Sequence, residues 1–148
     1  MELRPVTPED EAVLQAMTEQ PSIRRWGWTS IDDDATRLAV VVDGEVAGMI
    51  QYSEEEDPDF RHASIDLFLD AAHQGRGLGT EAVRRVVDLL LEERGHHRIT
   101  IDPAVDNHAA IRAYEKVGFR PVGVMEAAWR DPEGTWRDGL LMEFVRRP

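Results

Sequence analysis

The amino-acid sequence predicts an α/β (α+β) fold, in which a central mixed, mostly antiparallel sheet of about seven strands carries four helices. Three observations predict this fold. Two apolar runs flank the pair Asp43-Gly44, which is a strong hairpin signal. Alternating glycines between 75 and 79 separate an apolar run from a helix-like stretch, and two further apolar runs end the chain. Together the elements give the order β-α-α-β-β-β-α-β-α-β-β.

The N-terminal elements are a strand, a helix, and a short helix followed by a loop. Residues 2–6 alternate as a short strand does. A helix is expected to start at Thr7, which is followed by a proline and two acids, and to run to about Gln20. Pro21 breaks that helix, and residues 22–34 are expected to form a short helix and a loop.

The middle of the chain is predicted to form an antiparallel meander. Residues 37–43 and 46–53 make the hairpin, and residues 62–70 add a third strand. After the glycines, apolar residues recur at helical spacing over 83–91. This helix is expected to end near Gly95, a natural C-terminal stop.

The last part of the chain completes the sheet. Residues 98–102 form a strand that must cross back beside residues 62–70. A helix over 107–118 has an asparagine in the capping position and a glycine at its end. Two more strands, over 119–129 and 139–145, close the pattern.

Length and composition limit the possible functions. The 148 residues fit one domain spanning 1–148, and the net charge of −12 argues against a nucleic-acid partner. No apolar run is long enough for a membrane helix, and the first residues lack the features of a signal peptide, so a cytoplasmic protein without a membrane partner is expected. The absence of cysteine excludes thiol catalysis, and five scattered histidines give no expected metal site.

The glycine-rich segment at 74–79 has the composition of a phosphate-binding loop. A P-loop needs Gly-Lys-Ser/Thr, and the only lysine, Lys116, lies on another predicted helix. A dinucleotide-binding loop fits better, because residues 77–82 match G-x-G-x-x-A and Asp102 ends the next strand. Here, however, the motif follows a meander instead of opening the domain, and only 46 residues remain after Asp102. The dinucleotide-binding alternative is therefore disfavoured.

Residues 74–79 also fit a pyrophosphate loop of the pattern Q/R-x-x-G-x-G/A. Residues 107–119 match N-x-x-A-x-x-x-Y-x-x-x-G-F. With these two motifs and the same element order over nearly the whole chain, the sequence resembles the GCN5-related N-acetyltransferase (GNAT) superfamily. The resemblance implies acetyl-CoA as the cofactor, with its pyrophosphate against the glycine N–H groups and the N-terminus of the following helix.

The resemblance also implies a GNAT fold whose sheet is splayed. Strands 62–70 and 98–102 would part, and the pantetheine arm would pair with the exposed backbone as an added strand does. One backbone N–H would polarise the thioester carbonyl, and Tyr114 would protonate the leaving thiolate. The residues expected to contact coenzyme A are Leu67, Phe68, Leu69, Gln74, Gly75, Arg76, Gly77, Leu78, Gly79, Thr80, Asn107, Ala110, Tyr114 and Lys116.

Asp66 is the candidate general base. It is an acid inside the otherwise apolar run SIDLFL, where an aspartate that merely faces solvent is the alternative. A carboxylate at this place can bind an ammonium group and take a proton from it, directly or through water. Asp102 ends the strand expected beside it, so both acids are expected to face the gap.

A narrower resemblance concerns the acceptor. The segment 65–123 resembles aminoglycoside 6′-N-acetyltransferases of the short, single-domain type, as does the acid–glycine pair Asp138-Gly139. The C-terminal hairpin and the aromatic pattern at 26–28 depart from that group. The residues expected to bind the acceptor are Trp26, Trp28, Gln51, Glu54, Asp66, Asp102 and Asp138, with the acids of 54–57 as a rim.

The sequence therefore predicts direct acetyl transfer from acetyl-CoA to an aminoglycoside amine, at the 6′ nitrogen, in a ternary complex. Polyamines, protein N-termini and small metabolites remain alternative acceptors. The alternative outside enzymes is a non-catalytic acyl-CoA-binding domain, although Tyr114 together with Asp66 argues against it. The protein is expected to act on a cationic small-molecule amine as a monomer or homodimer.

Overall fold

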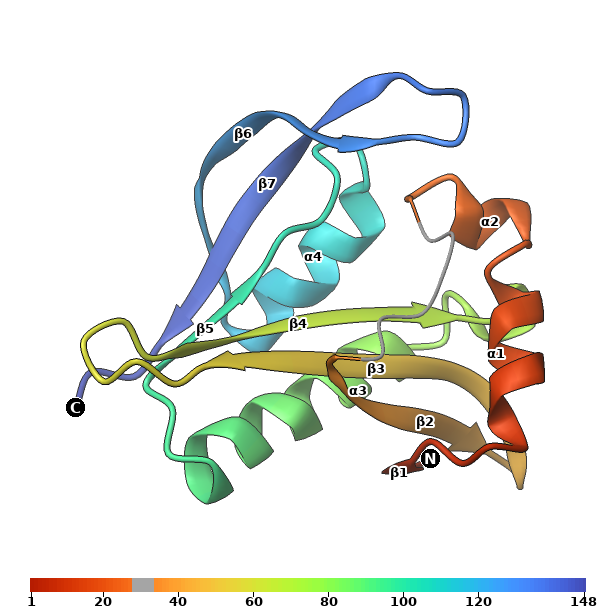
Figure 1. The fold of residues 1–148 in the computed structure, drawn as a ribbon, viewed down its shortest axis with the longest axis horizontal. Helices are drawn as coiled ribbons and strands as arrows, with labels where there is room; N and C mark the ends of the chain where they lie inside the picture. The colour runs from red at the N-terminus through yellow and green to blue at the C-terminus, as the bar shows by residue number, and fades with distance from the viewer. Residues whose placement is uncertain (28–33) are drawn as a thin grey trace.

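The computed structural model describes residues 1–27 and 34–148, and within them the chain forms a seven-stranded sheet (Figure 1). The strand order is β1-β2-β3-β4-β5-β7-β6. Among these strands, β4 and β5 alone run parallel, so the sheet is mixed and mostly antiparallel, as predicted. The strands are β1 (Glu2–Pro5), β2 (Thr36–Val42), β3 (Glu45–Glu55), β4 (His62–Leu69), β5 (Arg98–Ile101), β6 (Arg120–Arg130) and β7 (Trp136–Val145).

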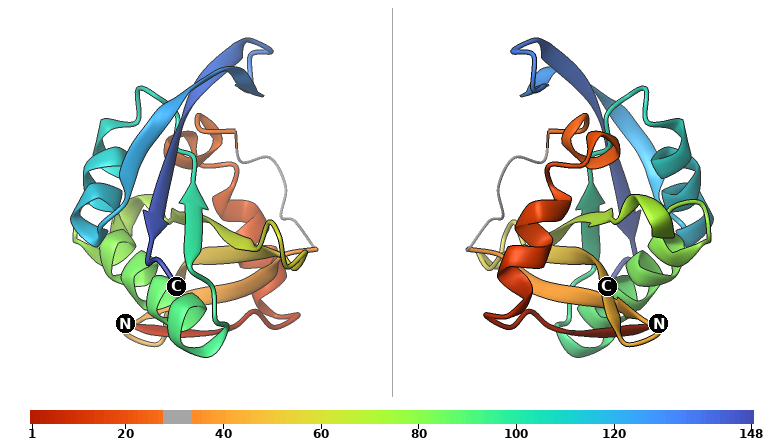
Figure 2. Two further views of the ribbon diagram at one scale, coloured as in Figure 1. Left: turned by 90° about the vertical axis from the view of Figure 1, so that its left-hand side faces the viewer. Right: turned by 90° about the vertical axis from the view of Figure 1, so that its right-hand side faces the viewer.

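Four helices cover the sheet, with α1 and α2 on one face and α3 and α4 on the other (Figure 2). A 3₁₀ turn, Ala71–His73, precedes α3, and a π-helical turn, Leu89–Glu93, follows it. In the described part of the chain, no helix is long and apolar enough to cross a membrane. The helices are α1 (Asp10–Met17), α2 (Pro21–Arg24), α3 (Leu78–Asp88) and α4 (His108–Val117).

Alternation along β4 divides the core between the two faces. Ile65 belongs to the larger apolar cluster, which includes Val83 of α3. Phe68 packs in a separate cluster with Leu14 of α1 and Ile23 of α2. Because successive side chains of a strand point to opposite faces, the even-numbered residues of β4 project toward α1 and α2. The odd-numbered residues project toward α3 and α4.

The start of α1 differs from the prediction. The regular α-helix begins at Asp10, and a turn that the Asp10 N–H closes on the Thr7 carbonyl (3.0 Å) precedes it. The Asp10 carboxylate accepts the Thr7 backbone N–H (2.8 Å) and hydroxyl (3.0 Å), as a residue three positions after a helix cap does, and it pairs with Arg4 (2.7 Å). The Arg4 hydrogen bond is the main reason that the pKa of Asp10 lies well below its usual range. Pro21 is the first residue of α2, a position that proline favours.

One predicted turn and two predicted helix caps are confirmed. Asp43 and Gly44 both have positive φ, 51° and 80°, as the tight turn of a hairpin requires. Asn107 caps α4 by accepting the Ala110 N–H (3.3 Å), and Gly118 ends that helix with a φ of 124°.

β4 and β5 pair only where they begin, and this opens the sheet. Ala63 lies opposite Ile99, and Ser64 lies opposite Thr100. The hydroxyls of Ser64 and Thr100, 2.8 Å apart, link the strands at the closed end of the fork. Beyond them the strands diverge, as predicted (Figure 1).

Candidate active site

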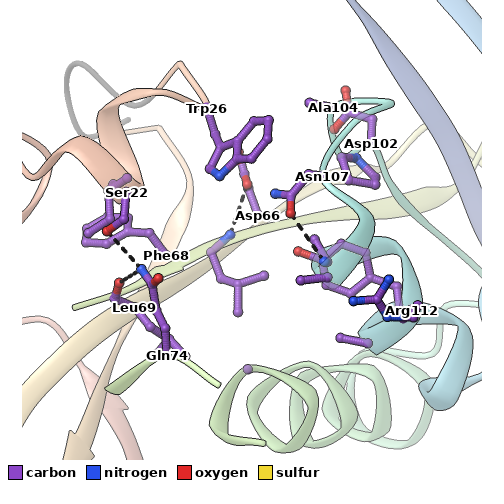
Figure 3. A pocket seen from close by; sticks show the side chains of 18 of the residues that line it. Ser22, Trp26, Asp66, Phe68, Leu69, Gln74, Asp102, Ala104, Asn107 and Arg112 are labelled. Atoms are coloured by element: carbon purple, nitrogen blue, oxygen red, sulfur yellow. Dashed lines mark hydrogen bonds between the residues drawn. The ribbon is translucent and has the colours of Figure 1, made fainter. Parts of the chain in front are cut away.

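A cleft of about 760 Å³ opens where β4 and β5 diverge (Figure 3). Its walls come from α2, the end of β4, the glycine-rich loop, the N-terminus of α3, α4, and the hairpin of β6 and β7. Because α2 lies on one face of the sheet and α3 and α4 lie on the other, the cleft connects the two faces. Side chains with different chemistry can therefore approach one point from opposite sides.

Two acids project from the diverging strands at equivalent positions. Asp66 is two residues beyond Ser64 on β4, and Asp102 is two residues beyond Thr100, just after β5. Alternation therefore places both carboxylates on the sheet face that α2 covers. Both residues line the cleft. The fork thus brings together two acids that are far apart in the sequence.

The pKa of Asp66 is raised to about 7. Its side chain opens into the cleft, but the surrounding protein withdraws water from it, and this desolvation is the main cause of the shift. The charge of Asp102 adds to it, whereas the hydrogen bond from the Leu67 N–H to Asp66 Oδ1 (2.9 Å) opposes it. Desolvation also raises the pKa of Asp102. Asp66 therefore changes its protonation state near neutral pH.

Tyr114 reaches the same cleft from α4. Its side chain is buried, and its ring centroid lies 6.3 Å from that of Phe119. Desolvation, followed by the negative charges of Asp66 and Asp102, raises the pKa of the Tyr114 phenol above its ordinary value. Tyr114 is therefore a protonated donor at neutral pH, within electrostatic reach of both acids.

The glycine-rich loop has a backbone conformation that other residues disfavour. Gly75 and Gly77 have φ of 74° and 79°, and a Cβ built on either would meet no heavy atom within 4 Å. Gln74 holds the loop, because its Nε2 donates to the Leu69 carbonyl (2.9 Å) and to Ser22 Oγ (3.2 Å). The loop thus combines a fixed backbone with open space beside its glycines.

The loop end of the cleft is suited to a polyanion. Gly77 precedes α3, and the first N–H groups of that helix, from Leu78 to Thr80, lack partners within the helix and border the cleft. Arg112 and Lys116, one turn apart on α4, line the same cleft, and neither side chain pairs with a carboxylate of residues 1–27 or 34–148. These groups fit the phosphates of coenzyme A.

Of the residues expected to contact coenzyme A, Arg76 alone does not line the cleft, and its side chain is exposed. The backbone expected to receive the pantetheine arm is partly engaged. The N–H of Leu67 donates to Asp66, and the carbonyl of Leu69 accepts from Gln74. An added arm therefore has to use the remaining backbone groups at the gap or displace these two hydrogen bonds.

Only some of the residues expected to bind the acceptor line the cleft. Trp26 lines the cleft with Asp66 and Asp102, whereas Trp28 lies outside the described residues. Gln51 lies opposite Asp66 in the β3–β4 register and projects from the same face, although it is not part of the cleft wall. In the described ranges, no three His, Asp or Glu side chains gather as metal ligands.

The structure does not bring the carboxylates of Glu54 and Asp138 to the cleft. Glu54 lies three positions from Gln51 on β3, so it projects from the opposite face, where it binds His96 Nε2 (2.6 Å) and Arg94 (2.8 Å). The Asp138 carboxylate instead accepts a backbone N–H within the β6–β7 hairpin (2.9 Å). The acids of 54–57 begin at the end of β3, beside the closed end of the fork.

Sequence reasoning does not identify Ser22, Arg112 or Trp129, which all line the cleft. Arg112 has a readable signal, because it precedes Lys116 by four residues on a predicted helix and so shares its face. Ser22 and Trp129 have no such signal in the sequence. Ser22 joins the site through a hydrogen bond from Gln74, and Trp129 reaches the cleft because of an irregularity in β6.

Proteins related in sequence include aminoglycoside acetyltransferases and a kanamycin resistance protein. Aminoglycoside N(6')-acetyltransferase type 1 of Klebsiella pneumoniae is 35% identical over 105 residues, which cover 63% of this chain and 51% of that protein. The kanamycin resistance protein of Rhizobium radiobacter is 44% identical over 75 residues, which cover 50% of this chain and 68% of that protein. The chain thus spans about half the length of the Klebsiella relative.

Solved structures share the fold. Aminoglycoside acetyltransferase AAC(6')-Ib in complex with coenzyme A and kanamycin has a TM-score of 0.78 at 28% identity, over 97% of this chain and 94% of that chain. Ribosomal-protein-alanine N-acetyltransferase from Brucella melitensis has a TM-score of 0.81 at 20% identity, over 99% and 100%, a likeness of fold alone. The model of the acetyltransferase (GNAT) family matches residues 4–119. Because this match covers most of the chain and the splayed sheet agrees with it, the chain belongs to the GNAT family of acetyltransferases.

Proposed function

We propose that this chain is an N-acetyltransferase that transfers acetyl from acetyl-CoA to an aminoglycoside amine, at the 6′ nitrogen, by direct transfer in a ternary complex. The observation that carries the proposal is one cleft that holds both Asp66, with a pKa of about 7, and a protonated Tyr114. The reaction needs a base for the amine and an acid for the leaving thiolate. Membership of the family supports the reaction, and the relatives' names support the acceptor.

Acetyl-CoA supplies the acyl group as an activated thioester. The residues that would hold its phosphates are the loop glycines, the first N–H groups of α3, and the two cations of α4, Arg112 and Lys116. The backbone groups at the open edge of β4 would pair with the pantetheine arm of the cofactor. This arrangement leaves the α2 side of the cleft, where Asp66 and Asp102 project, for the acceptor.

Asp66 makes the acceptor amine reactive by removing a proton. An ammonium group has no lone pair, and its pKa of about 10 lies roughly six units above that of an ordinary aspartate. A pKa of about 7 for Asp66 removes about half of this gap. Asp102 places a second negative charge nearby, which helps to retain the cation while the proton moves.

Tyr114 acts at the sulfur. Its raised pKa keeps the phenol protonated, so the hydroxyl donates a hydrogen bond as negative charge develops on the thiolate. Starting from the ammonium form, nitrogen loses two protons, one that frees its lone pair and one as the amide forms. One proton ends on the sulfur of the released CoA, and the other leaves to solvent.

The acceptor is tested by measuring CoA release with a panel of amines. Kanamycin, spermidine and a peptide with a free N-terminus are each supplied with acetyl-CoA. We expect kcat/KM for kanamycin to exceed the other two values by at least about tenfold, a ratio within reach of differences in binding contacts. If kanamycin is no better than a simple monoamine, the acceptor is wrong and the acetyltransferase proposal stands. If no amine releases CoA, the enzyme proposal itself fails.

The cofactor loop is tested by Gly77→Val. A β-branched residue disfavours the φ of 79° at this position, so the loop has to rearrange, and we expect CoA binding to weaken by at least about tenfold. Calorimetric titration with CoA measures the change. Gly95→Val is the matched control, because Gly95 has a similar φ (73°) and open surroundings but lies outside the cleft wall. Unchanged CoA affinity in folded Gly77→Val protein would contradict the assignment.

A further inference from the structure

The β6–β7 hairpin contains an irregularity beside the cleft. Regular pairing is interrupted between Met125 and Trp129, where three residues of β6 face a single residue of β7, Asp138. Ala127, in the middle of this bulge, has a φ of 47°, and its N–H donates to the Asp138 carboxylate (2.9 Å). A bulge of this kind changes the direction of the side chains that follow it.

Trp129, at the end of the bulge, lines the cleft. Its Nε1–H donates to the Asp138 carbonyl (3.3 Å), which fixes the indole ring. Gly27 lies against the ring, and a Cβ built on Gly27 would be 3.1 Å from Trp129 Cε3. Because Gly27 directly follows Trp26, the hairpin and the segment after α2 meet at the same side of the cleft. Figure 3 shows Trp26 and Asp66 reaching that cleft from different elements.

Aromatic faces and carboxylates thus occur together on the α2 side of the cleft. Asp66 and Asp102 can hold an ammonium group, but a charge recognises every amine in much the same way. Indole faces bury the apolar face of a carbon skeleton, and they also attract cations. Trp26 and Trp129 therefore provide the contact that can distinguish one amine-bearing skeleton from another.

We propose that Trp129 is a specificity-determining residue for the acceptor. Its indole packs against the ring that carries the reacting amine, with Trp26 on the adjoining wall, and so favours a cyclic amino sugar over a flexible alkylamine. This inference rests on the proposed function and deepens it. Gly27 takes part through its lack of a side chain, because its φ of 92° disfavours other residues and a Cβ there would crowd the indole at 3.1 Å.

The test uses Trp129→Ala, Trp129→Phe and Trp136→Ala. Trp136 is the matched control, because it belongs to the same hairpin, is 61% exposed and does not line the cleft. CoA release is measured with kanamycin and with spermidine as acceptors. Each acceptor is also titrated calorimetrically into CoA-saturated protein, which measures affinity without turnover.

Trp129→Ala is expected to raise the KM and Kd of kanamycin about tenfold, as truncation of a buried tryptophan anchor does. The values for spermidine and the KM of acetyl-CoA are expected to change by less than about twofold, because neither depends on a ring stacked on Trp129. Trp129→Phe keeps an aromatic face and is expected to recover most of the kanamycin affinity. Trp136→Ala is expected to behave as the wild type.

The outcomes separate this inference from the proposed function. An active wild type whose kanamycin affinity survives Trp129→Ala, or falls equally with Trp136→Ala, overturns the role of Trp129 and leaves the proposed function in place. Equal losses for kanamycin and spermidine overturn selection for a ring. A wild type that releases no CoA with any amine overturns the proposed function, and the calorimetric titrations still decide whether Trp129 binds the ring.

Discussion

Tyr114→Phe is expected to lower kcat by roughly 10²–10⁴-fold, while the KM of acetyl-CoA and of the acceptor changes little. The substitution removes one hydroxyl from a buried ring and leaves its contact with Phe119 in place. In the proposed mechanism this hydroxyl donates the proton to the thiolate, so the loss is expected in the chemical step. Steady-state rates of CoA release over a range of both substrates measure it.

The other tyrosine of the chain gives a matched control. Tyr52 is also buried, belongs to the same apolar cluster as Tyr114, and is not part of the cleft wall. Tyr52→Phe therefore tests the loss of a buried hydroxyl without the loss of a proton donor, and it is expected to keep kcat. If Tyr114→Phe keeps most of its kcat, or if both variants lose it equally, Tyr114 serves packing instead of catalysis.

The elements that could be predicted from the sequence depend on residues close together in the chain. The hairpin turn at Asp43-Gly44 and the Asn107 cap of α4 follow from the local preferences of two or three residues. The glycine loop is equally local, because only glycine readily adopts the φ of 74° at position 75 and 79° at position 77. The divergence of β4 and β5 has no such local signal, and the resemblance to the GNAT superfamily is what predicts it.

The acceptor-binding residues are harder to predict, because several of them depend on contacts between residues far apart in the sequence. Gln51 and Glu54 are three positions apart on one strand, so simple alternation already places them on opposite faces, and this signal was available in the sequence. The partners of Glu54, Arg94 and His96, are not neighbours in the sequence. Trp129 depends on the bulge in β6, which three-dimensional pairing alone reveals.

Asp66→Asn is expected to lower kcat/KM by roughly 10²–10⁴-fold above neutral pH, the range lost with a general base. With a pKa of about 7, wild-type Asp66 accepts a proton only when it is ionised, so wild-type kcat/KM falls as pH drops below 7. In the variant the inflection near pH 7 is expected to disappear, because the Asp66 carboxylate no longer titrates. The fraction of acceptor amine that is deprotonated then sets the dependence of kcat/KM on pH. A pH profile of kcat/KM for both proteins measures the two effects together.

The folding stability of Asp66→Asn provides an independent test of the raised pKa. The substitution is expected to lower activity but to increase stability. The unfolded aspartate has a pKa of about 3.9, so between about pH 4 and 7 the folded protein binds the extra proton, and its stability falls as pH rises. Asparagine carries no charge, so the variant is expected to be more stable than the wild type at pH 8, by thermal denaturation. Asp138→Asn is the control, because that carboxylate holds the β6 bulge outside the cleft wall, and its variant is expected to keep the inflection near pH 7. If Asp66→Asn is slow but its kcat/KM still shows the inflection near pH 7, another group is responsible for that titration. If the variant is less stable than the wild type at pH 8, Asp66 supports the fold.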